Sequence, residues 1–202
     1  MGASPSFRLR IHPLSVPALI LLFLFNEFSV LCVMLASLAV HEAGHVLVAR
    51  LQHRKIYSLT LTAGGAELSA QGVGFSYRAD TALHLGGVSA NFGLSILLFF
   101  LIRAHLSQLL FFAFYFNFFL VFFHLLPLST LDGGRALFCV LCSRVTLEKA
   151  DRIARATEVT TATLLLFVSL LLFVVSGFHL SLCALLVLCI SVILPAKKVP
   201  AV

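Results

Sequence analysis

Charged side chains are scarce in this chain. Only 11% of its 202 residues are Asp, Glu, Lys or Arg, whereas 60% are hydrophobic. A soluble domain is closer to half apolar and a quarter charged, so this composition excludes an ordinary soluble protein. The mean hydropathy of +1.08 indicates an integral membrane protein instead. The chain is too short for an additional soluble domain of ordinary size, so we expect a single transmembrane domain over residues 1–202.

The chain also lacks a concentrated basic region and a second cysteine pair. The net charge of +6 comes from basic residues spread over short connecting segments. Such residues are typical of topology determinants, and we expect no nucleic-acid partner. The five cysteines are odd in number and mostly lie in apolar runs, so we expect them to be reduced. Cys139 and Cys142 have the spacing of a metal pair, but a specific zinc site of that kind needs further ligands.

Long apolar runs separated by short polar segments predict an all-α polytopic membrane protein. A crossing needs about 20 apolar residues, although the first run is shorter. The expected spans are residues 14–26, 28–50, 82–102, 106–127, 158–176 and 178–195. If the N-terminus lies on the cytoplasmic side, every Lys and Arg of the connecting and terminal segments except Arg103 falls on that side as well. This distribution predicts that both termini are cytoplasmic. The polar segment from Arg144 to Glu158 is expected to be a solvated connecting helix.

Residues 57–70, between the second and third spans, break the helical pattern. Apolar and polar residues alternate on both sides of Gly64 and Gly65, as is typical of a β-hairpin. The sequence therefore predicts a small membrane-associated hairpin. Two roles fit it equally: a plain connector, or an exposed edge strand that pairs with an extended substrate.

The most informative motif is His41-Glu42-Ala43-Gly44-His45, which interrupts an apolar run. A charge at the centre of a bilayer costs about 3 kcal/mol on insertion scales, so these groups are expected to have a partner. On a helix, His41 and His45 lie one turn apart and can reach one metal ion, which in His-Glu-x-x-His is zinc. Glu42 is offset from that line and suits a general base toward a water whose pKa zinc lowers to about 7. A polar pair at a helix interface is the alternative.

A catalytic zinc needs a third protein ligand, for which Asp132 is the candidate. It is the other acidic residue in a strongly apolar neighbourhood, and Pro127, Gly133 and Gly134 break the helix around it. Non-helical backbone at membrane depth is tolerated where it lines a cavity. Taken alone, Asp132 is either the third ligand or part of a turn at the membrane boundary.

Together, the two motifs resemble those of the site-2 protease family of intramembrane zinc metalloproteases. The resemblance extends from Ile11-His12-Pro13 through Leu51 and the hairpin with Gly64 and Gly65. It continues through Gly86-Gly87-Val-Ser-Ala-Asn91 and His124-Leu-Leu-Pro127-Leu-Ser-Thr-Leu-Asp132-Gly-Gly-Arg135. It fades over the last two predicted spans. It is strongest to the sporulation branch, whose members process a pro-sigma factor in endospore-forming bacteria. It implies one zinc ion per chain, with His41, His45 and Asp132 as ligands and Glu42 as the general base.

The resemblance also implies a location and a set of partners. The protein is expected in the bacterial cell membrane, or in the mother-cell membrane around the forespore, where it hydrolyses a peptide bond in or beside a membrane segment. Its expected partners are the lipid bilayer, a membrane-associated protein substrate and a membrane inhibitor that blocks the site. The residues expected to contact substrate are His124, Pro127, Asn91, Gly65 and Asn117.

The chain departs from the family pattern at three points. His124 stands where the family usually has Asn, and Thr130 stands where the sporulation branch usually has Pro. Asn117, which precedes His124 by about two turns, is a candidate to replace the missing amide. No nucleotide-binding regulatory domain follows the last span, so we expect regulation to be lost or to come from partner proteins.

Two alternatives to a protease follow from these features. The altered His124 and Thr130 suggest a catalytically weak or inactive relative that binds membrane helices without cutting them. Histidines in membrane spans also mark ion pathways, which suggests a metal transporter. His84, His105 and His179 are scattered along the chain, which disfavours a continuous ion path.

Overall fold

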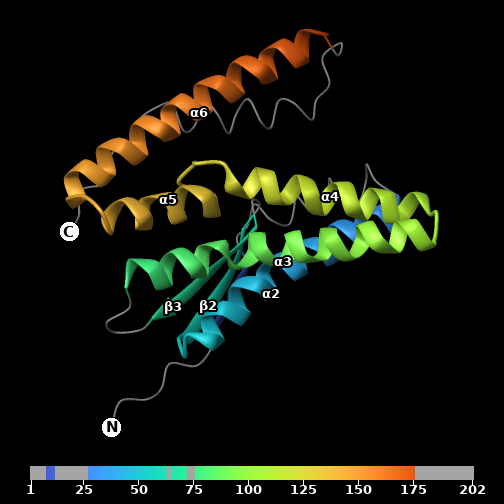
Figure 1. Cartoon of the computed structure of the whole chain (residues 1–202), viewed down its shortest axis with the longest axis horizontal. Coiled ribbons are helices and arrows are strands. Elements are labelled where there is room, and N and C mark those ends of the chain that lie inside the picture. The colour runs from blue at the N-terminus through green and yellow to red at the C-terminus, as the bar shows by residue number, and fades with distance from the viewer. Residues whose placement is uncertain (1–7, 12–26, 63–64, 72–75, 176–202) are drawn as a thin grey trace. The chain divides into compact units, whose positions relative to one another are not determined.

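The computed structural model describes residues 8–11, 27–62, 65–71 and 76–175, drawn in colour in Figure 1. The chain divides into two compact units, residues 1–124 and 125–202. Among the described residues, the first unit contains three long helices and a small sheet, and the second contains two helices. The helices are α2 (Phe28–Leu51), α3 (Tyr77–Ala104), α4 (Gln108–Leu125), α5 (Asp132–Cys142) and α6 (Leu147–Val175).

The described part of the chain contains four helices that are long and apolar enough to cross a membrane, namely α2, α3, α4 and α6. The first three agree with the spans predicted at 28–50, 82–102 and 106–127 to within a few residues. The spans predicted at 14–26 and 178–195 lie outside the described residues. These helices are those of a membrane protein, as the composition predicted.

Helix α6 differs from its prediction at the N-terminal end. The sequence predicts a solvated connecting helix up to Glu158 and a span from there onward. In the structure both belong to one helix that begins at Leu147, and Glu158 is buried rather than solvated, with 7% of its surface exposed. The prediction of a solvated segment was therefore wrong at its last residue.

The described residues form a three-stranded sheet, two strands of which lie between α2 and α3 in the chain order. Strands β2 (Lys55–Thr62) and β3 (Gly65–Gln71) pair antiparallel from Lys55 opposite Gln71 to Thr62 opposite Gly65, where the sequence predicts a hairpin. A further strand, β1 (Arg8–Ile11), pairs parallel with β2. The sequence predicts a helical protein with a β-hairpin and no further strand. Strand β1 corrects that prediction.

Small residues let α2 and α3 approach closely in the first unit. A Cβ atom on Gly44 would lie 2.7 Å from the Cβ of Ala90 and would collide with the carbonyl of Gly86. Conversely, a Cβ on Gly86 would lie 2.8 Å from the carbonyl oxygen of Gly44. Membrane helices commonly use glycines in this way, because backbone packing replaces the hydrophobic effect between helices. The contact fixes α3 against the segment of α2 that carries the two motif histidines.

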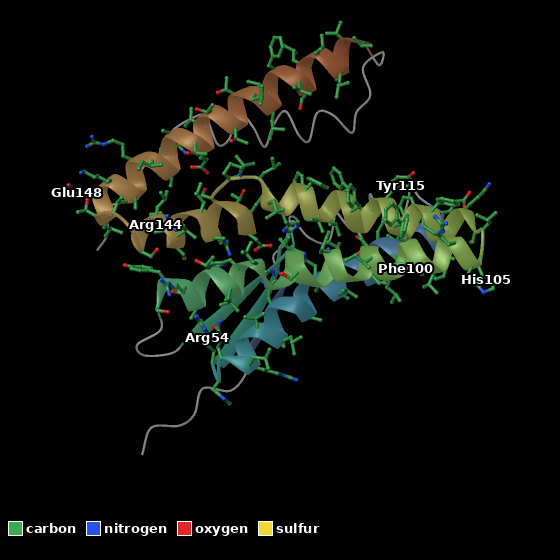
Figure 2. All side chains as sticks on the ribbon, in the orientation of Figure 1. Arg54, Phe100, His105, Tyr115, Arg144 and Glu148 are labelled. Carbon is green, nitrogen blue, oxygen red and sulfur yellow. The ribbon has the colours of Figure 1, made fainter. Side chains whose placement is uncertain are left out.

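The first unit buries several polar side chains and exposes many large apolar ones. Large apolar side chains face outward, as Phe100 of α3 and Tyr115 of α4 do, each with 63% of its surface exposed (Figure 2). The buried polar side chains found where burial is described in this unit are Ser37, His41, His45, Asn91, Ser95, Asn117 and His124. Polar side chains in membrane helices almost always face the interior of the bundle. The interior of α2, α3 and α4 is therefore where a functional site is expected.

Candidate metal centre

His41 and His45 form the centre of the site in the first unit. Both lie on the buried face of α2, with 1% and 8% of their surfaces exposed. Their Nε2 atoms are 3.2 Å apart. Two nitrogen ligands of one tetrahedral zinc, each about 2.0–2.1 Å from the metal, lie about 3.3–3.4 Å apart. The pair therefore has the nitrogen spacing that a shared zinc ion requires.

The opposite ring nitrogen of His45 is held by the backbone of α3. Its Nδ1 lies 2.8 Å from the carbonyl oxygen of Leu83. A carbonyl oxygen only accepts hydrogen bonds, so Nδ1 carries the proton and Nε2 retains its lone pair. Metal-ligating histidines are typically oriented through their second nitrogen in this way.

Asn91 of α3 occupies the corresponding place beside His41. The amide Nδ2 of Asn91 is 3.3 Å from His41 Nδ1, and its Oδ1 is buried without a hydrogen-bond partner among the described residues. The two ends of an amide are assigned from the hydrogen-bond network. The opposite orientation places Oδ1 where it accepts the His41 Nδ1 proton. That orientation satisfies the buried oxygen and leaves the His41 Nε2 lone pair for a metal.

Gly87 leaves the space in front of both histidines open. A Cβ atom at Gly87 would lie 2.5 Å from His45 Nε2 and 2.6 Å from His41 Nε2. Any side chain there would occupy the side of the nitrogens on which a metal would bind. The donor chemistry and this cradle both fit a zinc ion.

Glu42 and His124 flank the histidine pair. Glu42 follows His41 on α2 and is half-buried. His124, near the end of α4, is buried, and its ring centroid lies 4.1 Å from that of His41 at an interplanar angle of 50°. The residue that departs from the family pattern is therefore in contact with a predicted ligand.

Asn117 and Gly65, also in the first unit, have different surroundings. The buried Asn117 amide donates to Ser37 Oγ and to the carbonyl of Ala113, each at 2.8 Å. It thus contacts α2 one turn before His41. Gly65 begins β3, where it pairs with Thr62.

Asp132 is the first residue of α5 in the second unit. A carboxylate at this position is favoured by the positive end of the helix dipole. The two glycines that follow let the preceding segment fold back over the helix start. A Cβ on Gly133 would collide with the backbone of Leu125, and one on Gly134 with the carbonyl of Leu128. Pro127 belongs to this folded-back segment, where the predicted helix break is present, but Gly133 and Gly134, which were also predicted to break the helix, lie inside α5.

The predicted ligand set takes two imidazoles, His41 and His45, from the first unit and one carboxylate, Asp132, from the second. Two imidazoles and one carboxylate are a donor set typical of catalytic zinc, which keeps its fourth position open for water or substrate.

Two comparisons with known proteins point in the same direction. Residues 101–170 match the model of peptidase family M50. The matched part includes Asp132 and His124 but not the His-Glu-x-x-His motif. The structure is also similar to that of the site-2 protease from Methanocaldococcus jannaschii, with a TM-score of 0.66 over 100% of this chain and 97% of that one, at 19% identity. No curated protein sequence matches the chain. The fold is that of a site-2 protease, and the findings together support a metalloprotease.

The sequence did not reveal the surroundings of Glu158. One carboxylate oxygen, Oε1, accepts from the backbone N–H of Ser129 at 3.0 Å and from its hydroxyl, and Oε2 accepts from Arg155 at 2.9 Å. The mixed charges of this segment are typical of a solvated helix face. The local pattern therefore predicted a solvated Glu158, whereas the residue is buried. A partner 29 residues away leaves no local signal.

Proposed function

We propose that the chain is an intramembrane zinc metalloprotease that hydrolyses a peptide bond within or next to a membrane segment of a protein substrate. The observation that carries this proposal is the His41 and His45 nitrogen pair, spaced for one metal and left open by Gly87. The match to a metalloprotease family supports it. Asp132 completes the proposed ligand set of one zinc ion.

In the proposed hydrolysis, the histidines hold the zinc ion and Glu42 transfers the proton. Zinc, when bound, supplies a Lewis acid that acidifies water and polarises a carbonyl group. His45 and His41 keep their Nε2 lone pairs directed toward it through Leu83 and Asn91. Glu42 accepts the proton of the attacking water and delivers it to the amine that leaves. The apolar surroundings of α2, α3 and α4 exclude bulk water, which strengthens these interactions.

For the substrate, we propose a membrane-associated chain that is extended where it is cut. In the order β1-β2-β3 of the described strands, β3 lies at one edge of the sheet. An edge strand offers free backbone groups to an extended segment, and Gly65 begins that strand. His124, Pro127, Asn91 and Asn117 are the other proposed substrate contacts. A pro-sigma factor of a spore-forming bacterium is the proposed substrate, on the strength of the resemblance in the motifs.

We also propose that both termini are cytoplasmic and that a membrane inhibitor regulates the site. The distribution of Lys and Arg supports the orientation. Co-purification of a small membrane protein that blocks cleavage would support the inhibitor, and constitutive cleavage by the chain alone in cells would contradict it.

A cleavage assay with the full chain in lipid tests the proposed activity. The substrates are a panel of pro-sigma factors and signal peptides, and the variants are Glu42→Gln and the control Glu27→Gln. Glu27 is an exposed carboxylate immediately before α2, so its change matches the chemistry without touching the site. We expect the wild type and Glu27→Gln to cut at least one substrate and Glu42→Gln to cut none. If the wild type and both variants leave every substrate uncut, the result would favour an inactive relative that binds membrane helices.

A further inference from the structure

The second unit contains a buried carboxylate for which the proposed reaction has no role. Glu158 of α6 is 7% exposed, and both its oxygens accept hydrogen bonds, from Ser129 and from Arg155. A buried carboxylate is costly unless it is paired and hydrogen-bonded. Its contacts therefore indicate which part of the structure it holds.

Most of these hydrogen bonds go to Ser129, in the segment between α4 and α5. Ser129 gives both its backbone N–H and its hydroxyl to Glu158 Oε1. Arg155 lies one turn from Glu158 on the same helix, and 44% of its side chain is exposed. Solvent around the Arg155 side chain screens this ion pair and weakens it. The main structural role of the Glu158 carboxylate is therefore to hold the segment that contains Ser129.

Ser129 lies within the turn that leads directly into Asp132. The N–H of Leu131 donates to the carbonyl of Leu128 at 2.8 Å, which closes the turn over residues 128–131. The Leu128 side chain is fully buried, and its carbonyl lies against Gly134 of α5. The turn is thus held by α5 on one side and by Glu158 on the other. Asp132 is the next residue along the chain.

We propose that Glu158 is a positioning residue, which fixes the turn at Ser129 and thereby sets the direction of the Asp132 carboxylate. Metal ligands depend on such supporting contacts, whose loss typically weakens metal binding 10–100-fold. The inference rests on the proposed function, because it concerns the third zinc ligand. It adds a residue on α6 that neither zinc-binding motif contains.

The test measures the zinc dissociation constant and the visible absorption spectrum of the cobalt-substituted protein, using the full chain in detergent. The variants are Glu158→Ala and Glu158→Gln, with Asp132→Ala as the reference for a lost ligand. Glu148→Gln is the control, because Glu148 is an exposed carboxylate at the start of the same helix (Figure 2). Spectrum and affinity together separate a displaced ligand from a general loss of stability.

We expect Glu158→Ala to weaken zinc binding about 10–100-fold and to shift the cobalt spectrum toward that of Asp132→Ala. Glu158→Gln, which retains an oxygen for the Ser129 N–H, should weaken it less, and Glu148→Gln should match the wild type. A wild-type spectrum and zinc affinity in Glu158→Ala would overturn the proposal. If Glu158→Ala does not fold, Glu158→Gln and Ser129→Ala decide, and wild-type values in both would overturn it. Wild-type protein without stoichiometric zinc would instead refute the proposed function.

Discussion

A Cβ atom on Gly87 would lie 2.5 Å from the Nε2 atom of His45. Helix α3 therefore bounds the proposed zinc position with a residue that has no side chain. Gly87→Ala places a methyl group against both ligand nitrogens, and we expect it to lower zinc binding at least tenfold, or to separate α2 from α3. Metal analysis of the purified variant, together with its thermal unfolding, measures both effects.

Gly93 of the same helix provides the matched control. A Cβ atom there would meet nothing within 4 Å. Alanine is favoured over glycine in a helix interior by about 1 kcal/mol, so Gly93→Ala should be neutral or slightly stabilising and should retain full zinc. Equal loss of zinc in both variants would show that Gly87 has no special relation to the histidines.

The Asn91 amide is expected to orient His41 through its oxygen. Asn91→Leu removes the acceptor for the His41 Nδ1 proton and should weaken zinc binding about 10–100-fold. Asn91→Asp keeps an acceptor in the same place and should retain zinc. Titration with a competing chelator measures the affinities. If Asn91→Asp loses zinc as fully as Asn91→Leu does, the amide instead donates to His41.

His124 is expected to act on the substrate rather than as a zinc ligand. The ring lies against His41, at the position where the resembling family has an amide. We expect His124→Asn to keep one zinc per chain and at least the wild-type cleavage rate. His124→Ala should keep zinc but cleave about tenfold more slowly, which corresponds to the loss of one hydrogen bond worth about 1.4 kcal/mol. Loss of zinc from both variants would make His124 part of the metal shell.

Local sequence pattern predicted the features that depend on neighbouring residues. Hydropathy identified α2, α3 and α4, and the four-residue spacing placed His41 and His45 on one helix face. Pro127 marked the break between α4 and α5. These signals are local because helix periodicity and turn chemistry are local.

Features that depend on distant pairing were missed. Strand β1 is identified only by its pairing with β2, more than 40 residues away. Glu158 lies among charged residues that resemble a solvated helix face, yet its partner is Ser129. Gly87 was part of a recognised motif, but its place in front of the two histidines follows from the crossing of α2 and α3.

The account depends most directly on one zinc ion held by His41, His45 and Asp132. Zinc analysis combined with X-ray absorption spectroscopy of the purified full chain measures both its stoichiometry and its ligands. We predict one zinc per chain with two imidazole nitrogens and a carboxylate oxygen, and loss of the carboxylate from the zinc shell of Asp132→Ala. Protein without stoichiometric zinc, or an unchanged zinc shell in Asp132→Ala, would contradict the account.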